Sequence, residues 1–195
     1  MTPLVVMISG KQGSGKSSLA SNLRASLEGM GQRVASVRFA SAIYEMHDWI
    51  RDYMRSRGID RPEKDGRLLQ LLGTEWGRDT ISPDVWVNLL ENRIEEMVGE
   101  IDVVLIDDCR FPNELALVNR FSGLTIRLDA DRNVRKARCP AWRDTDTHSS
   151  ETALDNAKFD TWICTDTVDE QYTARTALEA VVFALEERRA GGDGQ

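Results

Sequence analysis

Residues 10–18 read GKQGSGKSS; they follow the apolar run Leu4–Ser9 and precede a segment whose leucines recur at helical spacing. The stretch fits the pattern G-x-x-x-x-G-K-[ST], which describes a phosphate-binding loop between a strand and a helix. Gly13 and Gly15 permit backbone angles that turn several N–H groups toward one anion. The following helix presents its positive end to the same anion. The stretch therefore predicts a nucleotide-phosphate site at the first strand-to-helix turn.

Two side chains of this loop have separate expected tasks. Lys16 neutralises charge between the β- and γ-phosphates of a bound triphosphate, and Ser17 supplies an oxygen to Mg²⁺. The alternative is a glycine turn with an exposed lysine. We predict ATP and Mg²⁺ as ligands. The predicted cofactor-binding residues are Gly10, Gly13, Ser14, Gly15, Lys16, Ser17 and Ser18.

Short apolar runs alternate with helical patterns along the chain, which predicts a mainly parallel sheet covered by helices on both faces. Strands are expected at Leu4–Ser9, Val34–Ala40, Asp102–Ile106, Thr125–Asp129 and Thr161–Thr165. Helices are expected at Gly15–Leu27, Ala42–Arg55, Leu68–Ile81, Asp84–Val98, Glu114–Phe121 and Glu170–Arg189. The fold class is therefore α/β, a three-layer sandwich with a five-stranded sheet.

Residues 1–195 are expected to form one domain, because their number suits a single core of useful size. Residues 41–99 carry helical patterns without a strand and form a helical insertion. Residues 130–150 are polar and rich in arginine, which favours a mobile lid over a site. Residues 190–195 are expected to be a flexible tail.

Composition narrows the class of protein. The net charge of −7 disfavours duplex nucleic acid as a main partner. Three cysteines without a CxxC pair argue against a disulfide framework or a zinc site and favour a reducing compartment. No apolar run approaches the roughly 20 residues that span a bilayer, and the first residues make a poor signal peptide. We expect a cytoplasmic protein without a membrane partner.

Asp107 and Asp108 end the apolar strand after Ile101. A carboxylate at the carboxyl end of a strand beside a phosphate loop can hold Mg²⁺, usually through water. The alternative is a turn aspartate that caps the helix starting near Pro112. With the phosphate loop present, the pair predicts a metal-binding carboxylate.

Three blocks of sequence resemble the phage deoxynucleoside monophosphate kinases, a branch of the P-loop nucleoside monophosphate kinases. They are the phosphate loop, residues 66–90 (GRLLQLLGTEWGRDTISPDVWVNLL), and IDDCRFPNE together with DTHSSETALD at residues 146–155. The resemblance implies transfer of the γ-phosphoryl group of ATP to a deoxynucleoside monophosphate. It also implies that Asp108, rather than Asp107, is the metal residue. A phage source would place the protein in the host cytoplasm, and a homodimer is compatible with the sequence.

The same resemblance makes residues 41–99 the acceptor-binding region. Arg67 and Arg78 lie close to three α-helical turns apart and are expected on one face, as forks for a phosphate. Gly66 stands where the family usually has the first of two basic residues, and Lys64 is the nearby candidate to replace it. Arg110 is expected to grip the acceptor phosphate, the alternative being an ion pair with Glu114. The predicted substrate-binding residues are Arg67, Trp76, Arg78, Asp84, Trp86, Arg110, Glu114 and Glu151.

Several of these assignments have structural alternatives. Trp76 and Trp86 stack on a base or pack in the core, and Asp84 or Glu75 accepts from a base edge or a sugar hydroxyl. In the block at residues 146–155, a helix cap by Thr147 or Ser149 is favoured over a role for His148 and Glu151 at the nucleotide.

The lid carries five basic residues: Arg132, Arg135, Lys136, Arg138 and Arg143. Arginines that close over a site stabilise charge on the transferred phosphoryl group and exclude water. Arg132 and Arg135, three positions apart, are the first candidates and Arg143 is the second. The predicted catalytic residues are Lys16, Asp108, Arg110, Arg132 and Arg135.

Two other functions fit the phosphate loop. One is a kinase that phosphorylates a hydroxymethylated pyrimidine base, such as 5-hydroxymethyluracil, in DNA or a nucleotide, with Asp107, Asp108 or Glu114 as base. DNA is a partner only under that reading. The other is a nucleotide-hydrolysing switch or motor. It is disfavoured because the sequence lacks N-K-x-D and an Asp-Glu pair at the end of the acidic strand.

Overall fold

The computed structural model describes residues 1–140, 142 and 149–192. Five strands form one parallel sheet in the order β2-β3-β1-β4-β5. They are β1 (Leu4–Ser9), β2 (Val34–Val37), β3 (Val103–Cys109), β4 (Leu124–Asp129) and β5 (Thr161–Cys164). All five predicted strands are confirmed, and so is the predicted α/β sandwich. The lid residues 141 and 143–148 and the tail residues 193–195 lie outside the described part.

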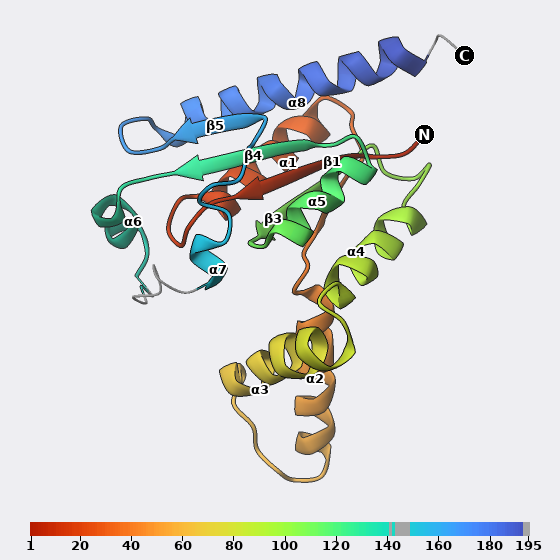
Figure 1. The fold of residues 1–195 in the computed structure, drawn as a ribbon, viewed down its shortest axis with the longest axis vertical. Helices are drawn as coiled ribbons and strands as arrows, with labels where there is room; N and C mark the ends of the chain where they lie inside the picture. The colour runs from red at the N-terminus through yellow and green to blue at the C-terminus, as the bar shows by residue number, and fades with distance from the viewer. Residues whose placement is uncertain (141, 143–148, 193–195) are drawn as a thin grey trace.

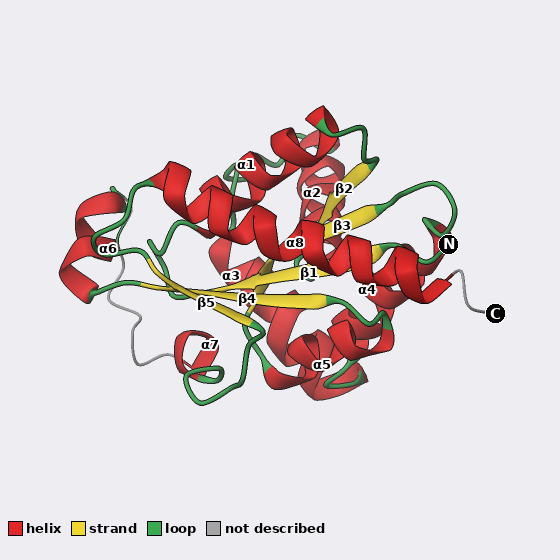
Figure 2. Cartoon of the chain, turned by 90° about the horizontal axis from the view of Figure 1, so that it is seen from above, coloured by secondary structure: helices red, strands yellow, loops and turns green. Residues whose placement is uncertain are grey.

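Helices cover both faces of the sheet (Figure 2). On one face, α1 (Lys16–Gly29) and α8 (Glu170–Gly192) pack side chains such as Leu23 and Val181 against Val6. On the other, α4 (Val85–Glu96) and α5 (Pro112–Arg120) pack against Met7 and its neighbours. All six residues of β1 are buried, as expected for a central strand covered on both faces.

The predicted insertion between the second and third strands is a helical arm. It contains α2 (Ser41–Ser56), α3 (Gly66–Gln70) and η1 (Leu71–Ile81), and α4 leads back to the sheet. Figure 1 shows α2 and α3 standing away from the sheet, below its plane in that view. The side chains of the arm therefore form a surface beside the sheet, separate from the residues at the strand ends.

The helix predicted over Leu68–Ile81 is divided in two. Its first residues form α3, capped by the Asp65 side chain, and the rest, η1, is a π-helix. A π-helix has i→i+5 hydrogen bonds, so the spacing that placed Arg67 and Arg78 on one α-helical face does not apply. Gly77 allows Trp86 to pack against the backbone of η1, because a Cβ there would collide with the indole ring.

A short helix, α6 (Arg132–Arg138), lies in the segment predicted as a lid, and a second, α7 (Ser149–Thr152), begins at the end of that segment. Both lie near the edge toward which β1 and β4 point, where parallel strands end (Figure 1). No helix in the described residues is long and apolar enough to cross a lipid bilayer.

Candidate active site

The loop between β1 and α1 has the geometry expected of an anion cradle. Gly13 and Gly15 have φ values of 78° and 96°, in the left-handed region that favours glycine. A Cβ on Gly13 would also collide with the carbonyl group of Arg135. Gly15 is the N-cap of α1, so the helix begins at Lys16 and directs its positive end into the loop.

Lys16 bends back over this loop. Its Nζ donates to the carbonyl oxygens of Gly10 at 2.6 Å and Lys11 at 2.9 Å. Burial, followed by the nearby charge of Arg110, lowers the pKa of Lys16 to about 8. A bound phosphate would supply negative charge that stabilises the ammonium form and raises this pKa again. The Ser14 hydroxyl is also buried, and it has no hydrogen-bond partner among the described residues.

A cavity of about 830 Å³ adjoins the loop. Residues after β5, including Val168 and Asp169, line it together with Arg138 and Cys139 from the end of α6. Arg138 is fixed there because its guanidinium donates to the carbonyl of Thr165 at 2.7 Å. A space of this size suits a nucleotide base and sugar next to a phosphate cradle.

Of the two aspartates at the end of β3, Asp107 is the one that lies beside the loop. Its Oδ2 accepts from the Ser17 hydroxyl at 3.0 Å. Arg38 forks the same carboxylate, with Nε at 2.6 Å from Oδ1 and Nη2 at 2.8 Å from Oδ2. Burial alone would raise the pKa of Asp107, but the hydrogen bonds from Arg38 and Ser17 outweigh it and leave the pKa below its ordinary value.

Asp108 does not fit the metal role predicted for it. Its carboxylate accepts the backbone N–H groups of Phe39 at 3.1 Å and Ala40 at 3.0 Å, at the start of the arm. Burial raises the pKa of Asp108 to about 6. The reason is that successive side chains of a strand point to opposite faces of the sheet. Asp107 lies on the same face of β3 as Leu105, which is the face covered by α1, and Asp108 lies on the opposite face.

The described residues contain no cluster of three or more acidic, histidine or cysteine side chains that could bind a metal ion. Ser17 and Asp107 nevertheless form a pair of hard oxygen donors at the phosphate loop. That set fits Mg²⁺, which keeps several waters and takes only one or two protein ligands besides substrate phosphates.

On the other side of the loop, two buried glutamates each hold one predicted substrate arginine. Glu114 accepts from Arg78 Nη2 at 2.6 Å and from the backbone N–H of Arg110 at 2.7 Å. Glu151 pairs with Arg110 Nη1 and accepts the backbone N–H of Gln12 at 2.8 Å. The side chain of Arg110 therefore pairs with Glu151, not with Glu114 as the alternative had it.

The predicted base-stacking role of Trp86 is wrong. Its side chain is 1% exposed, and its Nε1 donates to the Gly73 carbonyl at 2.8 Å, which makes it the packing centre between α4 and η1. Trp76, by contrast, is 42% exposed on η1. Asp84 accepts from Asn113 Nδ2 at 2.9 Å and joins the start of α4 to α5.

Arg67 lies on the exposed surface of α3, and the described residues provide no hydrogen bond or ion pair to its guanidinium group. Arg78, by contrast, is half-buried, paired with Glu114 and stacked 4.5 Å above the Phe111 ring.

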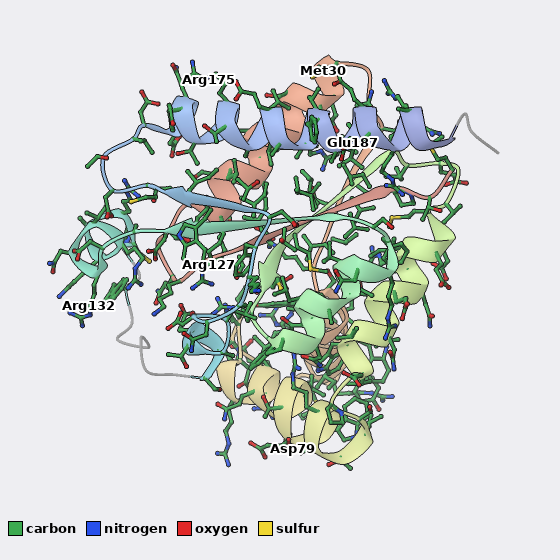
Figure 3. The ribbon with its side chains drawn as sticks, turned by 45° about the horizontal axis from the view of Figure 1, so that its top comes forward. Met30, Asp79, Arg127, Arg132, Arg175 and Glu187 are labelled. Carbon is green, nitrogen blue, oxygen red and sulfur yellow. The ribbon has the colours of Figure 1, made fainter. Side chains whose placement is uncertain are left out.

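The arginines of α6 differ from the expectation of a pair facing the site. Arg135 is buried and supports the loop, with Nε donating to the Ala130 carbonyl at 3.0 Å and Nη1 to the Gln12 carbonyl at 3.1 Å. Its predicted catalytic role does not fit this inward position. Arg132 is exposed near the Trp142 ring, at the outer side of α6 (Figure 3). Arg143, Thr147 and His148 lie outside the described residues.

Sequence reasoning missed Arg38 and Arg127. Arg127 on β4 is buried, donates to the Ser9 hydroxyl at 3.0 Å and to Asp155 Oδ1 at 3.1 Å, and lies under the sheet (Figure 3). Asp155 Oδ2 in turn accepts from Lys11 of the loop at 2.9 Å. The available signal was an arginine within an otherwise apolar strand, because a buried arginine requires an acidic partner.

No protein-family model matches the sequence. Over 58 residues the chain is 40% identical to the deoxynucleoside-5′-monophosphate kinase of Escherichia phage T5, and this match covers 30% of the chain but only 22% of that protein. It confirms the sequence resemblance over part of the chain.

Several solved structures share the fold over nearly the whole chain. An APS kinase from Mycobacterium tuberculosis, in complex with AMPPNP and APS, is 15% identical with a TM-score of 0.55, covering 95% of this chain and 98% of its own. A gluconokinase from Sinorhizobium meliloti is 16% identical with a TM-score of 0.54, covering 97% and 98%. The chain therefore has the fold of the P-loop kinases.

Proposed function

We propose that this protein is a phosphotransferase that moves the γ-phosphoryl group of ATP to the phosphate of a deoxynucleoside monophosphate. The observation that carries the proposal is the bridge from Gln12 through Glu151 to Arg110. It sets a guanidinium group next to the phosphate loop, so a triphosphate in the loop and a monophosphate at Arg110 would meet end to end. The kinase fold and the partial match to a phage deoxynucleotide kinase support the same reaction.

On the donor side, the loop glycines, Lys16 and the positive end of α1 would bind the phosphates of ATP. The base and sugar would occupy the 830 Å³ cavity beside Val168. Asp107 and Ser17 would hold Mg²⁺, directly or through water, in place of the Asp108 expected from the resemblance. When bound, Mg²⁺ neutralises charge on the β- and γ-phosphates.

On the acceptor side, Arg110 would bind the phosphate, and Glu151 and Glu114 would orient Arg110. Arg78 is set by Glu114 and Phe111 at the base of the arm, where it would add a second guanidinium group. Arg67 on α3 and the exposed ring of Trp76 on η1 would contact the rest of the nucleotide. These cations supply the fork geometry that phosphate oxygens favour.

The proposed reaction needs no covalent bond between the substrate and the protein. A phosphate oxygen of the acceptor attacks the γ-phosphorus, the bond from that phosphorus to the β–γ bridging oxygen breaks, and ADP leaves. The acceptor oxygen is already ionised at neutral pH, so no general base is required. Alignment and charge neutralisation account for the catalysis. Arg138, at the rim of the cavity, is placed to help exclude water.

The test is a panel of deoxynucleoside and ribonucleoside monophosphates incubated with ATP and Mg²⁺, with diphosphate formation as the readout. We expect ADP to appear only with an acceptor and in equal amount to a nucleoside diphosphate. Phosphorylation of 5-hydroxymethyluracil in DNA, with no reaction of free nucleotides, would replace the proposal by the base-kinase alternative. Rapid ADP release without any acceptor would replace it by a nucleotide hydrolase.

A further inference from the structure

Two acidic residues at α7 contact the phosphate loop, and they do so in different ways. Glu151, in α7 itself, accepts the Gln12 backbone N–H at 2.8 Å. Asp155, just after α7, pairs with the Lys11 side chain at 2.9 Å. Both contacts attach to the part of the loop before Gly13, away from the helix end that faces the donor phosphates.

The second partner of each acid separates their roles. Glu151 also pairs with Arg110, the residue proposed to grip the acceptor phosphate. Asp155 instead pairs with Arg127, which is buried beneath the sheet against Ser9. Glu151 is therefore shared by the proposed donor and acceptor sites, whereas Asp155 belongs to the donor loop and the core.

Because Glu151 is buried, breaking its contacts is energetically costly. Its side chain is 4% exposed, and a buried carboxylate that loses its cation is strongly disfavoured. Arg110, with five N–H donors, can keep Nη1 on Glu151 and still offer others to a phosphate. An acceptor that fixes Arg110 thereby fixes Glu151, and Glu151 fixes the Gln12 peptide of the loop.

Electrostatics join the same groups. Both Arg110 and Glu151 affect the pKa of Lys16: the charge of Arg110 lowers it and the charge of Glu151 raises it. A change in the position of Arg110 relative to Glu151 is thus felt at the lysine that contacts the donor phosphates. This supports the connection that the hydrogen bonds already establish.

We propose that Glu151 is a positioning residue that couples the two substrate sites, so that binding of either nucleotide strengthens binding of the other. The inference rests on the proposed function and deepens it. It adds that the acceptor signal travels from Arg110 through the Glu151 carboxylate to the Gln12 peptide. Linkage requires the effect to be reciprocal, with the same factor seen from either side.

The experiment is calorimetric titration of the full chain with a non-hydrolysable ATP analogue, alone and with saturating deoxynucleoside monophosphate, using each acceptor phosphorylated in the panel. We expect the wild type to bind the analogue at least about fivefold more tightly when the acceptor is present, at the lower end of typical coupling. Glu151→Gln keeps the size of the side chain but removes its charge, and should bring that factor close to one. It should also raise the acceptor KM at saturating ATP.

Two further variants make the test specific. Glu151→Asp keeps the charge, but its side chain is too short to contact both Arg110 and Gln12, so this variant should also lose the coupling. It allows the same test if the Glu151→Gln variant does not fold. Asp155→Asn is the matched control: it weakens the Lys11 contact and should lower affinity for the analogue while leaving the coupling factor at the wild-type value.

The outcomes separate the inference from the function on which it rests. A wild type without coupling, full coupling in both Glu151 variants, or equal loss in Asp155→Asn would each overturn the role of Glu151 while leaving turnover intact. A protein that phosphorylates no nucleoside monophosphate overturns the proposed function, and the coupling proposal falls with it.

Discussion

The Asp107 carboxylate lies 3.0 Å from the Ser17 hydroxyl, at the edge where β3 and the phosphate loop meet. Its neighbour Asp108 turns to the backbone of Phe39 and Ala40 instead. The two adjacent carboxylates should therefore have separable roles: Asp107 at the proposed Mg²⁺ site, and Asp108 at the start of the arm.

We expect Asp107→Asn to raise the Mg²⁺ concentration needed for half-maximal activity by about 10–100-fold, the usual cost of disturbing a metal site. Asp108→Asn should leave the Mg²⁺ requirement near the wild-type value and change the acceptor KM, because it loosens the arm. Activity measured against Mg²⁺ concentration decides between them. An increased Mg²⁺ requirement only in Asp108→Asn would restore the assignment implied by the family resemblance.

Lys16→Ala should lower kcat by roughly 10²–10³-fold or more, because it removes the cation nearest the transferred phosphoryl group. The melting temperature should change little, since among the described residues the hydrogen bonds of the Lys16 ammonium group go to carbonyl groups of its own loop. Lys11→Ala is the control in the same loop; its side chain pairs with Asp155 and should cost far less activity. Full activity of Lys16→Ala would reject the phosphate-loop assignment.

Arg67→Ala should raise the acceptor KM by about tenfold or more with little change in the KM for ATP, given about 1.5–3 kcal/mol for a hydrogen bond to a charged group. Arg57→Ala removes another arginine of the arm, one stacked on Tyr53, and serves as the charge-matched control. Steady-state kinetics with each substrate varied measure both effects. An acceptor KM that changes equally in both variants would remove Arg67 from the substrate site.

The two tryptophans of the arm should differ in kind. Trp86→Ala should destabilise the protein by about 3–5 kcal/mol, because it leaves a cavity against Gly77 and an unpaired Gly73 carbonyl. Trp76→Ala should leave the free energy of unfolding within about 1 kcal/mol of wild type and raise the acceptor KM. Urea denaturation with kinetics tests both, and comparable destabilisation by the two variants would contradict their assignment.

The ion pair between Arg33 and Asp102 predicts a pH dependence of stability. Hydrogen bonds from the Arg33 side chain and then its backbone N–H lower the pKa of Asp102 from 3.8 to about 2. A lowered carboxyl pKa stabilises the folded state above pH 3.8, and this contribution is lost as the pH falls toward 2. Asp102→Asn should therefore have a lower melting temperature than wild type at pH 7. The difference should shrink as the pH falls from 5 to 2; a constant difference would contradict the prediction.

The sequence predicted the sheet well because each strand is a short apolar run, and the three central strands β3, β1 and β4 are buried on both faces. The phosphate loop was equally predictable, since the local backbone has positive φ values at Gly13 and Gly15, which favour glycine. Both features depend on residues that are neighbours in the chain.

The rest depends on contacts between distant residues. The choice of Asp107 over Asp108 follows from which face of β3 meets α1, and Arg38 enters the site only because β2 lies beside β3. The π-helix forms where Trp86 packs against Gly77, a contact that helical periodicity cannot predict. The two partners of Glu151 come from the phosphate loop and from the residue that follows β3, so only the fold brings them together.

The central claim is that two nucleotides meet phosphate to phosphate between the loop and the arm. The most direct measurement is a crystal structure with a bisubstrate analogue, adenosine joined through a polyphosphate to a deoxynucleoside. We expect adenosine in the cavity beside Val168, the polyphosphate at Lys16 and Arg110, and the deoxynucleoside against α3 and η1. An analogue bound only by its adenosine half, with Arg67, Arg78 and Arg110 making no contact to it, would contradict the account.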